Sequence, residues 1–365
     1  IAYFGFRRHC PSLVGAPIIK VFGRRPMAIA VAWLCNLLAI VAIAIGLGGS
    51  VAMGVFQVKE GVDVLFGLTD SGMGLTLGIF ALLVICYLLP LTVDLSRGMA
   101  LLSNLAMAIA AGLMIFILLA GPTHFLMGGI TQSLGEYFGG ALLQGFRTFT
   151  FMDERIDNWF QSWTLNYMVW WLAWAPFVGV FIARISRGRT IREFLVGVIL
   201  GPTLFSVFWF GVFGGVSFYG VLQGDNSLLE VARSNVDGVA FQVLKLFPLP
   251  SLTIFAVVVA AFLFIVTSVV SAAFVLGMFS SNGDLNPSPR IKLVWGVILG
   301  ALGLVMILSG SIDAVKSIIA LGALPFVFIV SLLVVCLLKA LKQEPLVKAG
   351  PPQGLTQPSA EEGLS

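Results

Sequence analysis

The chain has 365 residues, of which 59% are hydrophobic and 10% are charged, and its mean hydropathy is +1.03. This composition excludes an ordinary soluble domain and indicates a polytopic membrane protein. The net charge of +4 does not point to a nucleic-acid partner, and two histidines and four scattered cysteines predict neither a metal-dependent enzyme nor a disulfide framework.

The chain begins with a short apolar stretch that runs directly into Arg7 and Arg8. Because the positive charge follows the apolar residues, the stretch is not a signal peptide. It has the character of the last turns of a spanning helix. We therefore expect the sequence to lack an N-terminal portion.

A membrane helix needs about 20 predominantly apolar residues. Eight stretches meet this requirement: 27–55, 72–93, 100–121, 160–183, 194–218, 251–279, 291–309 and 317–338. The segments between the third and fourth spans and between the fifth and sixth carry short mixed apolar and polar patterns. Helices that lie at the membrane interface are expected there.

Lysine and arginine are distributed unevenly among the loops. With both ends of the chain inside, 15 of the 21 basic residues fall on the inner side. The positive-inside rule therefore predicts a multi-pass protein of the cell inner (plasma) membrane with a cytoplasmic C-terminus. The tail is rich in proline and then acidic, so we expect it to be disordered.

The fourth span carries aromatic side chains at helical spacing. Trp163, Tyr167, Trp170, Trp171 and Trp174 follow one another at steps of four, three, one and three residues. At about 100° per residue, these steps give one stripe of rings. The faces of tryptophan attract cations, and quaternary ammonium groups profit most from an aromatic cage. The stripe therefore predicts a site for a cationic group.

Pro176 follows the stripe directly. It lacks an N–H and its ring crowds the preceding turn, so the helix is expected to kink or unwind beside the tryptophans. Irregular backbone at membrane depth lines cavities, and in transporters it commonly marks the binding site. From the residues alone, two interpretations stay open: a cage for a cationic solute, or bulky side chains that fill the core or face lipid.

The run SWTLNYMVWWLAWAPFVGVFIARISRGRTIREF (162–194) resembles the signature of the betaine/carnitine/choline transporter family. Further segments resemble family segments in family order: 54–67, 133–138, 201–215, 267–281 and 317–326. The resemblance extends to about Glu344. It implies an all-α polytopic membrane protein with the leucine-transporter-type inverted-repeat fold, of whose twelve spans the fifth to twelfth are present.

This resemblance also implies a division of the chain into four parts. Residues 1–25 would hold the end of span four and a cytoplasmic loop. Residues 26–158 would hold the last spans of the first repeat with an extracellular interfacial helix. Residues 159–341 would form the second five-helix repeat, and residues 342–365 the disordered cytoplasmic tail.

As to function, the resemblance implies a secondary active transporter, not an enzyme, that imports glycine betaine, choline or carnitine as an osmoprotectant by alternating access. In that family the tryptophans matching Trp170, Trp171 and Trp174 line the central site, to which the stripe adds Tyr167. Met168 stands where the family usually has tryptophan, so the shape of the site and its solute stay open. The family is often trimeric, so a homotrimer in the lipid bilayer is a further expectation.

Thr267 and Ser268 lie side by side in the sixth span. Hydroxyls within a membrane often only bond to the preceding turn, whereas hard cations such as Na⁺ bind hydroxyl and carbonyl oxygens. In sodium-coupled family members, residues matching these two, with the carbonyl matching Phe264, contribute to a sodium site. Val270 and Ala273 depart from the family pattern. Na⁺ is thus the expected coupling ion, with no other cofactor, while proton coupling or exchange, and another zwitterion or a sulfonium compound as solute, remain alternatives.

Overall fold

The computed structural model describes residues 1–69, 71–92 and 96–344; most of the predicted disordered tail lies outside the described residues. These residues form helices and no strand, which confirms the all-α fold class. In chain order the elements are η1 (Tyr3–Arg7), α1 (Ala16–Phe22), α2 (Pro26–Phe66), α3 (Gly72–Thr92), α4 (Ser96–Ala120), α5 (Thr123–Gly145), α6 (Glu154–Trp159), η2 (Phe160–Leu165), α7 (Asn166–Ile185), α8 (Ile191–Leu222), α9 (Ser227–Ser234), η3 (Val236–Gly238), α10 (Val239–Lys245), α11 (Pro250–Ser280), α12 (Pro289–Leu308) and α13 (Ile312–Lys342).

Eight helical segments of the described chain are long and apolar enough to cross a membrane, as the sequence predicts. They correspond to α2, α3, α4, the continuous run from α6 to α7, α8, α11, α12 and α13. The protein is therefore an all-α polytopic membrane protein. The predicted division into repeats and tail stays a prediction.

The first span is longer than predicted. Its expected end was residue 55, whereas α2 continues to Phe66 and contains 41 residues. The extra turns contain charged side chains, so the criterion of about 20 apolar residues did not include them. In the structure Lys59 and Asp63, one turn apart, form an ion pair of 2.9 Å, and such a pair is compatible with a helix. The helix ends where Gly67 adopts the left-handed conformation (φ 66°) that glycine tolerates without strain.

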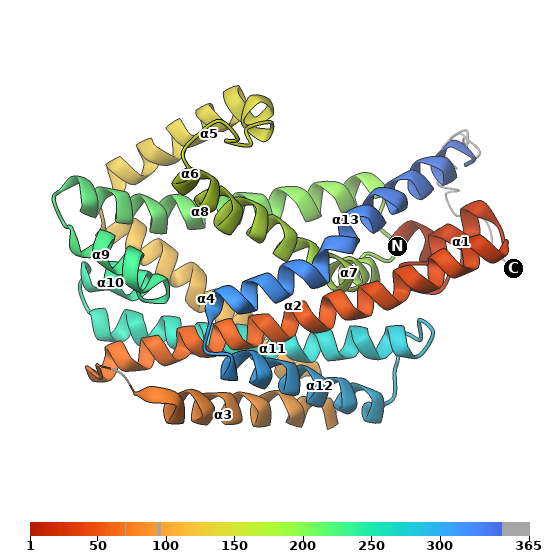
Figure 1. Ribbon diagram of the computed structural model, residues 1–365, viewed down its shortest axis with the longest axis horizontal. Coiled ribbons are helices and arrows are strands. Elements are labelled where there is room, and N and C mark those ends of the chain that lie inside the picture. Colours follow the sequence, from red (N-terminus) through yellow and green to blue (C-terminus); the bar gives the residue numbers. More distant parts are fainter. Residues whose placement is uncertain (70, 93–95, 345–365) are drawn as a thin grey trace, which may run out of the picture.

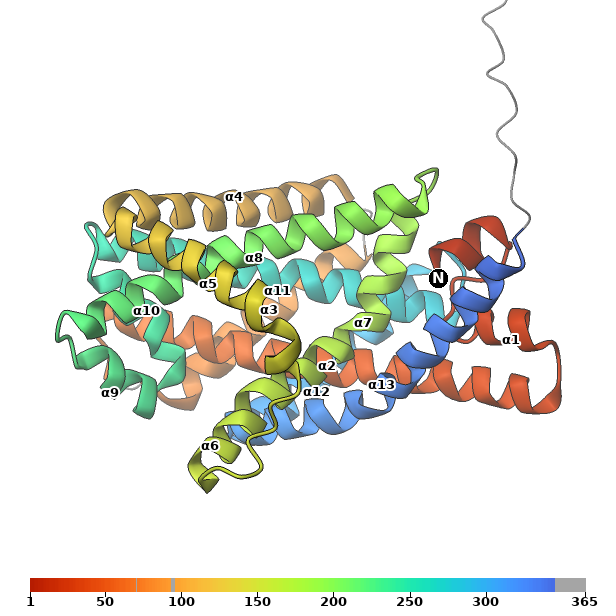
Figure 2. The same ribbon diagram turned by 90° about the horizontal axis from the view of Figure 1, so that it is seen from above.

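The long helix α2 lies in the middle of the bundle (Figures 1 and 2). It packs against α11, α12, α13 and α7, and α7 and α13 also pack against each other. The short helices α9 and α10 gather at one end of the bundle, and α1 lies at the opposite end. We call the first the loop end.

Helices occur in both segments for which interfacial helices were expected. One is α5, which packs along α8 because Leu126 and Ile130 fit over Gly215 and Gly211 of that helix. The other segment folds into α9, η3 and α10. The first segment thus adds to a face of the bundle and the second to its loop end, and neither is among the candidate membrane spans.

Basic side chains that the sequence predicts on the inner side of the membrane lie over aromatic rings. The guanidinium of Arg184, at the end of α7, lies 4.7 Å from the ring centroid of Phe274, and the ammonium of Lys292 lies 5.6 Å from the same ring. Lys339 lies 4.7 Å from the ring of Phe22 in α1. The structure therefore brings the basic ends of several spans together away from the loop end.

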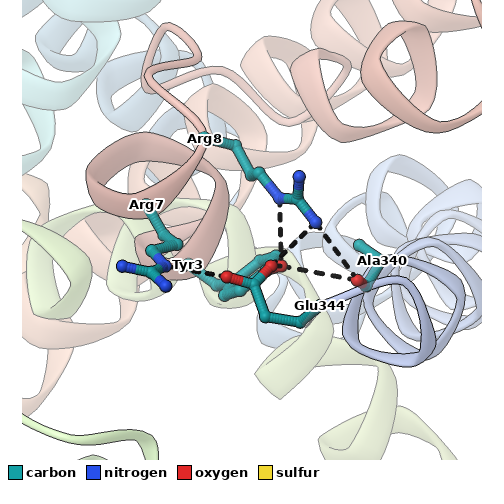
Figure 3. Close-up of polar contacts among 5 residues, drawn as sticks. All are labelled: Tyr3, Arg7, Arg8, Ala340 and Glu344. Atoms are coloured by element: carbon teal, nitrogen blue, oxygen red, sulfur yellow. Dashed lines mark hydrogen bonds and ion pairs between the residues drawn. The ribbon is translucent and has the colours of Figure 1, made fainter. Parts of the chain in front are cut away.

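The first turns of the chain are bound to the end of α13 through one carboxylate (Figure 3). Glu344 accepts a hydrogen bond of 2.6 Å from the Tyr3 hydroxyl and forms ion pairs of 2.8 Å with Arg7 and with Arg8. Arg8 also donates to the carbonyl of Ala340 at 3.4 Å. The pKa of Glu344 lies below its ordinary value because the Tyr3 hydroxyl and the Arg7 guanidinium donate to it and Arg8 lies beside it.

Gly46 sets the distance between α2 and α7. A methyl group at this position would lie 2.8 Å from the Cβ of Ala173. We expect Gly46→Val to lower the free energy of unfolding by roughly 1–3 kcal/mol, because the two helices must move apart. Thermal unfolding of the purified protein in detergent measures this change. Gly112→Val is the control, since a Cβ there meets open space; equal losses in both variants would contradict the predicted contact.

The Glu344 cluster predicts a pH-dependent stability. Since the folded-state pKa of Glu344 is lowered, its stabilising contribution is present above the unfolded carboxyl pKa and is lost as the pH falls through the lowered value. We expect Glu344→Gln to reduce thermal stability near neutral pH and to converge with the unsubstituted protein in acid. Thermal unfolding over a pH series is the measurement. Glu154→Gln, at an exposed carboxylate, serves as control, and a pH-independent difference would refute the prediction.

Candidate functional site

The π-helix η2 and the helix α7 that continues it carry aromatic rings that contact one another. Trp163 and Tyr167 stack with a centroid distance of 5.5 Å and an interplanar angle of 2°, and Tyr167 meets Trp170 at 5.5 Å and 37°. Further along, Trp174 meets Phe177 at 6.0 Å. We call the first three rings, Trp163, Tyr167 and Trp170, the aromatic column. The spacing predicted from the sequence thus brings these rings into contact.

A pocket of about 150 Å³ lies where α7, α2 and α11 meet. It is lined by Leu47, Ser50 and Val51 of α2, Trp174 of α7, and Phe264, Ile265, Ser268 and Val269 of α11. A cavity of this volume with apolar walls can hold a molecule of about the size of benzene. The polar side-chain groups of its lining are the hydroxyls of Ser50 and Ser268 and the indole N–H of Trp174. The pocket therefore suits a small solute whose surface is mostly apolar.

The predicted aromatic residues differ in where they lie. Trp174 lines the pocket. Trp170 is half-buried and donates its indole N–H to the Ser50 hydroxyl at 3.4 Å, a long hydrogen bond that joins the column to the pocket wall. Tyr167 is half-buried between its two ring neighbours. Trp171 is 75% exposed and lies outside the pocket.

The predicted ion ligands lie on α11, and two of the three face the pocket. Phe264 and Ser268 line it, whereas Thr267 is buried beside them. The Thr267 hydroxyl lies 3.0 Å from the carbonyl of Leu263 and 3.1 Å from that of Phe264. The Thr267 hydroxyl thus bonds to the preceding turn of its own helix, which is the alternative to binding Na⁺ that was expected from the sequence. It also places two oxygens, of Thr267 and Phe264, at a separation that one hard cation can bridge.

The irregular backbone lies at the first ring of the aromatic column and not at the proline. Helix α7 continues through Pro176, so the helix is not unwound there, although the missing N–H removes one bond. The π-helix η2 covers Phe160–Leu165 and contains Trp163, the first ring of the column. Single π-helical turns often occur at functional sites, because the wider turn changes the direction of the side chains that follow.

Sequence reasoning missed Ser50 as a site residue. Its hydroxyl donates to the carbonyl of Gly46 at 2.8 Å and accepts from Trp170, so it links α2 to α7 beside the pocket. In the sequence, Ser50 could have been noticed as a hydroxyl that follows a run of glycines in the middle of a long apolar span. Gly48 and Gly49 allow the neighbouring helices α12 and α13 to approach α2 closely at this level.

Comparison with known proteins agrees with this architecture. The family model for BCCT, betaine/carnitine/choline family transporters, matches residues 1–346. The chain therefore belongs to this family. Family members are transporters and not enzymes, and the protein is a multi-pass membrane protein of a bacterial transporter family.

Three bacterial relatives illustrate the range of solutes in the family. The glycine betaine transporter OpuD of Bacillus subtilis is 36% identical, and the alignment covers 94% of this chain and 66% of the relative. The ectoine/hydroxyectoine transporter of Virgibacillus pantothenticus is 31% identical, covering 91% and 65%. The high-affinity choline transport protein of Escherichia coli K12 is 32% identical, covering 94% and 51%. The chain thus spans between about half and two thirds of the length of these relatives.

Proposed function

We propose that this protein imports a quaternary-ammonium solute, namely glycine betaine, choline or carnitine, by alternating access and in symport with Na⁺. The observation that carries the proposal is the pocket in which Trp174 faces Phe264 and Ser268. Family membership supports the transport of such solutes. One ring expected to hold an ammonium group, that of Trp174, and one hydroxyl expected to hold a coupling ion, that of Ser268, thus line the same pocket.

The aromatic rings of α7 would hold the methylated ammonium. This group has no N–H to satisfy, so a cage of ring faces replaces its hydration without leaving unpaired donors. A desolvated cation–π contact contributes about 2 kcal/mol. Trp174 and Trp170 would supply such contacts in or beside the pocket, and the Ser50 hydroxyl would fix the indole of Trp170.

The ion site would lie on α11, next to the solute. Thr267 and Phe264 would contribute their hydroxyl and carbonyl oxygens, 3.1 Å apart, and Ser268 would contribute a hydroxyl from the pocket wall. Hard cations such as Na⁺ prefer such neutral oxygens in transporters. Because the ion and the solute would share α11, occupancy of one site would favour the conformation that binds the other.

The proposed orientation places α9 and α10 outside and the C-terminus in the cytoplasm of the cell. It is supported by the clustering of Arg184, Lys292 and Lys339 away from the loop end. Assembly as a homotrimer is part of the same proposal, and the many exposed apolar side chains on α8 would face lipid or a neighbouring subunit.

A second candidate is a transporter of the same fold for another zwitterion, coupled to protons or working by exchange. One relative is named for ectoine and hydroxyectoine. The exposure of Trp171 and the presence of Met168 in place of an aromatic ring favour a less complete cage. Competition of radiolabelled betaine uptake by unlabelled ectoine separates the two candidates.

The aromatic site predicts the behaviour of a tryptophan variant. We expect Trp174→Ala in the intact gene product to reduce saturable uptake of glycine betaine or choline by roughly thirtyfold, the equivalent of one lost cation–π contact. Uptake of radiolabelled solute by transport-deficient cells is the measurement, corrected for the amount of protein in the membrane. Trp33→Ala is the control, since Trp33 is 65% exposed on α2. Unchanged uptake by the Trp174 variant would remove the aromatic site from the proposal.

The ion site predicts a dependence on Na⁺. We expect uptake to collapse when K⁺ replaces Na⁺, and Thr267→Ala and Ser268→Ala to raise the Na⁺ concentration for half-maximal uptake at least several-fold. The control is Thr253→Ala, because Thr253 is also buried on α11 and also bonds to carbonyls of the preceding turn. Uptake that is indifferent to Na⁺ would keep the solute class and discard the ion site.

A further inference from the structure

A buried lysine lies against the outer end of the aromatic column. Lys316 belongs to the second turn of α13 and is only 9% exposed. Its ammonium lies 5.3 Å from the ring centroid of Trp163 and 6.0 Å from that of Tyr167, both within cation–π range. The chain's own cation therefore occupies ring faces of the kind proposed to hold the ammonium of the solute.

The acidic side chains around Lys316 come from three elements. Asp313 of α13 is nearest at 3.9 Å, but its side chain is 95% exposed, so its contribution is screened by water. Asp237 of η3 also interacts with Lys316, and Glu60 of α2 interacts in turn with Asp237. The pKa of Asp237 is raised because the side chain is buried and because Glu60 repels its charge, while Lys316 acts in the opposite direction. Glu60 lies beside η3, since a Cβ on Gly238 would be 3.2 Å from its carboxylate.

Lys316 is connected to the pocket through the column. Tyr167, which faces the ammonium, contacts Trp170, and Trp170 bonds to Ser50 in the pocket wall. Trp170 follows Tyr167 by three positions, a rise of about 4.5 Å along the helix, and the centroids of the two rings lie 5.5 Å apart. The rings that Lys316 faces are therefore the next neighbours of the ring that bonds to the pocket wall. A zwitterion that bound against these outer rings would meet the ammonium of Lys316.

We propose that Lys316 is a specificity-determining residue of an outer subsite, with Trp163 and Tyr167, that favours solutes carrying a carboxylate over solutes that are purely cationic. The inference rests on the proposed function and narrows its solute class. The ammonium of Lys316 attracts the carboxylate of glycine betaine and repels the net charge of choline. Interactions between unit charges a few ångströms apart in a half-buried site are strong enough to change relative affinities about tenfold.

The test compares uptake of radiolabelled choline and glycine betaine by the intact gene product, with kcat/KM measured for each. We expect Lys316→Met to raise the ratio of the kcat/KM for choline to the kcat/KM for glycine betaine about tenfold. Lys316→Arg keeps the charge and should leave this ratio within about twofold of its original value. The matched control is Lys339→Met, which removes another ring-facing ammonium from the same helix and should leave the ratio unchanged. A ratio that does not change in Lys316→Met overturns the inference, because a merely structural role lowers both uptakes together.

A second variant decides the matter if Lys316→Met does not reach the membrane. Lys316→Gln keeps a polar side chain at this position and removes its charge, so the ratio of the kcat/KM for choline to that for betaine should rise severalfold. An unchanged ratio in this variant overturns the inference. If the unsubstituted protein takes up neither solute, the proposed function fails and the inference fails with it; if it takes up both while the ratios stay fixed, only the inference fails.

Discussion

The close approach of α2 to its neighbours is the contact on which the rest of the bundle depends. In a membrane, helices gain little from hiding apolar surface from lipid, so they associate through tight packing and through a few polar bonds. Gly46, Gly48 and Gly49 provide that packing, toward Ala173 of α7, Leu302 of α12 and Ile319 of α13. Ser50 provides the polar bond at the same level. The pocket lies next to these contacts, so its walls are held by the residues that hold the bundle.

The candidate site brings together two kinds of side chain from two helices. Helix α7 contributes ring faces, which bind cations without donors or acceptors, and α11 contributes oxygens, which suit small hard ions. Neither helix alone forms an enclosed space. Because α2 packs against both, its small residues determine how far apart the two walls lie. Lys316 adds a third element, a fixed charge on α13 at the end of the ring line, where an ion and an aromatic surface already interact without a solute.

Much of this architecture could be predicted from the sequence because lipid imposes one simple rule, a stretch of about 20 apolar residues per crossing. All eight spans follow it. The rule failed at the end of α2, where the pairing of Lys59 with Asp63 accompanies a helix that continues past the apolar window. The helical spacing predicted the contacts of Tyr167 with Trp163 and Trp170, but spacing alone does not determine which neighbouring helix covers a side chain. The exposure of Trp171 and the burial of Lys316 against Trp163 and Tyr167 depend on how the helices pack in space, which the local sequence pattern does not contain.

The carboxylate of Glu344 has a consequence for how the protein is made. Its partner Arg7 lies 337 residues earlier in the chain. Spans enter a membrane in the order of their synthesis, and contacts between distant residues form only after the intervening chain is in place. Arg7 and Arg8 therefore cannot pair with Glu344 until α13 has been inserted. The ion pairs of Glu344 with Arg7 and Arg8 are thus among the last tertiary contacts between these helices to form.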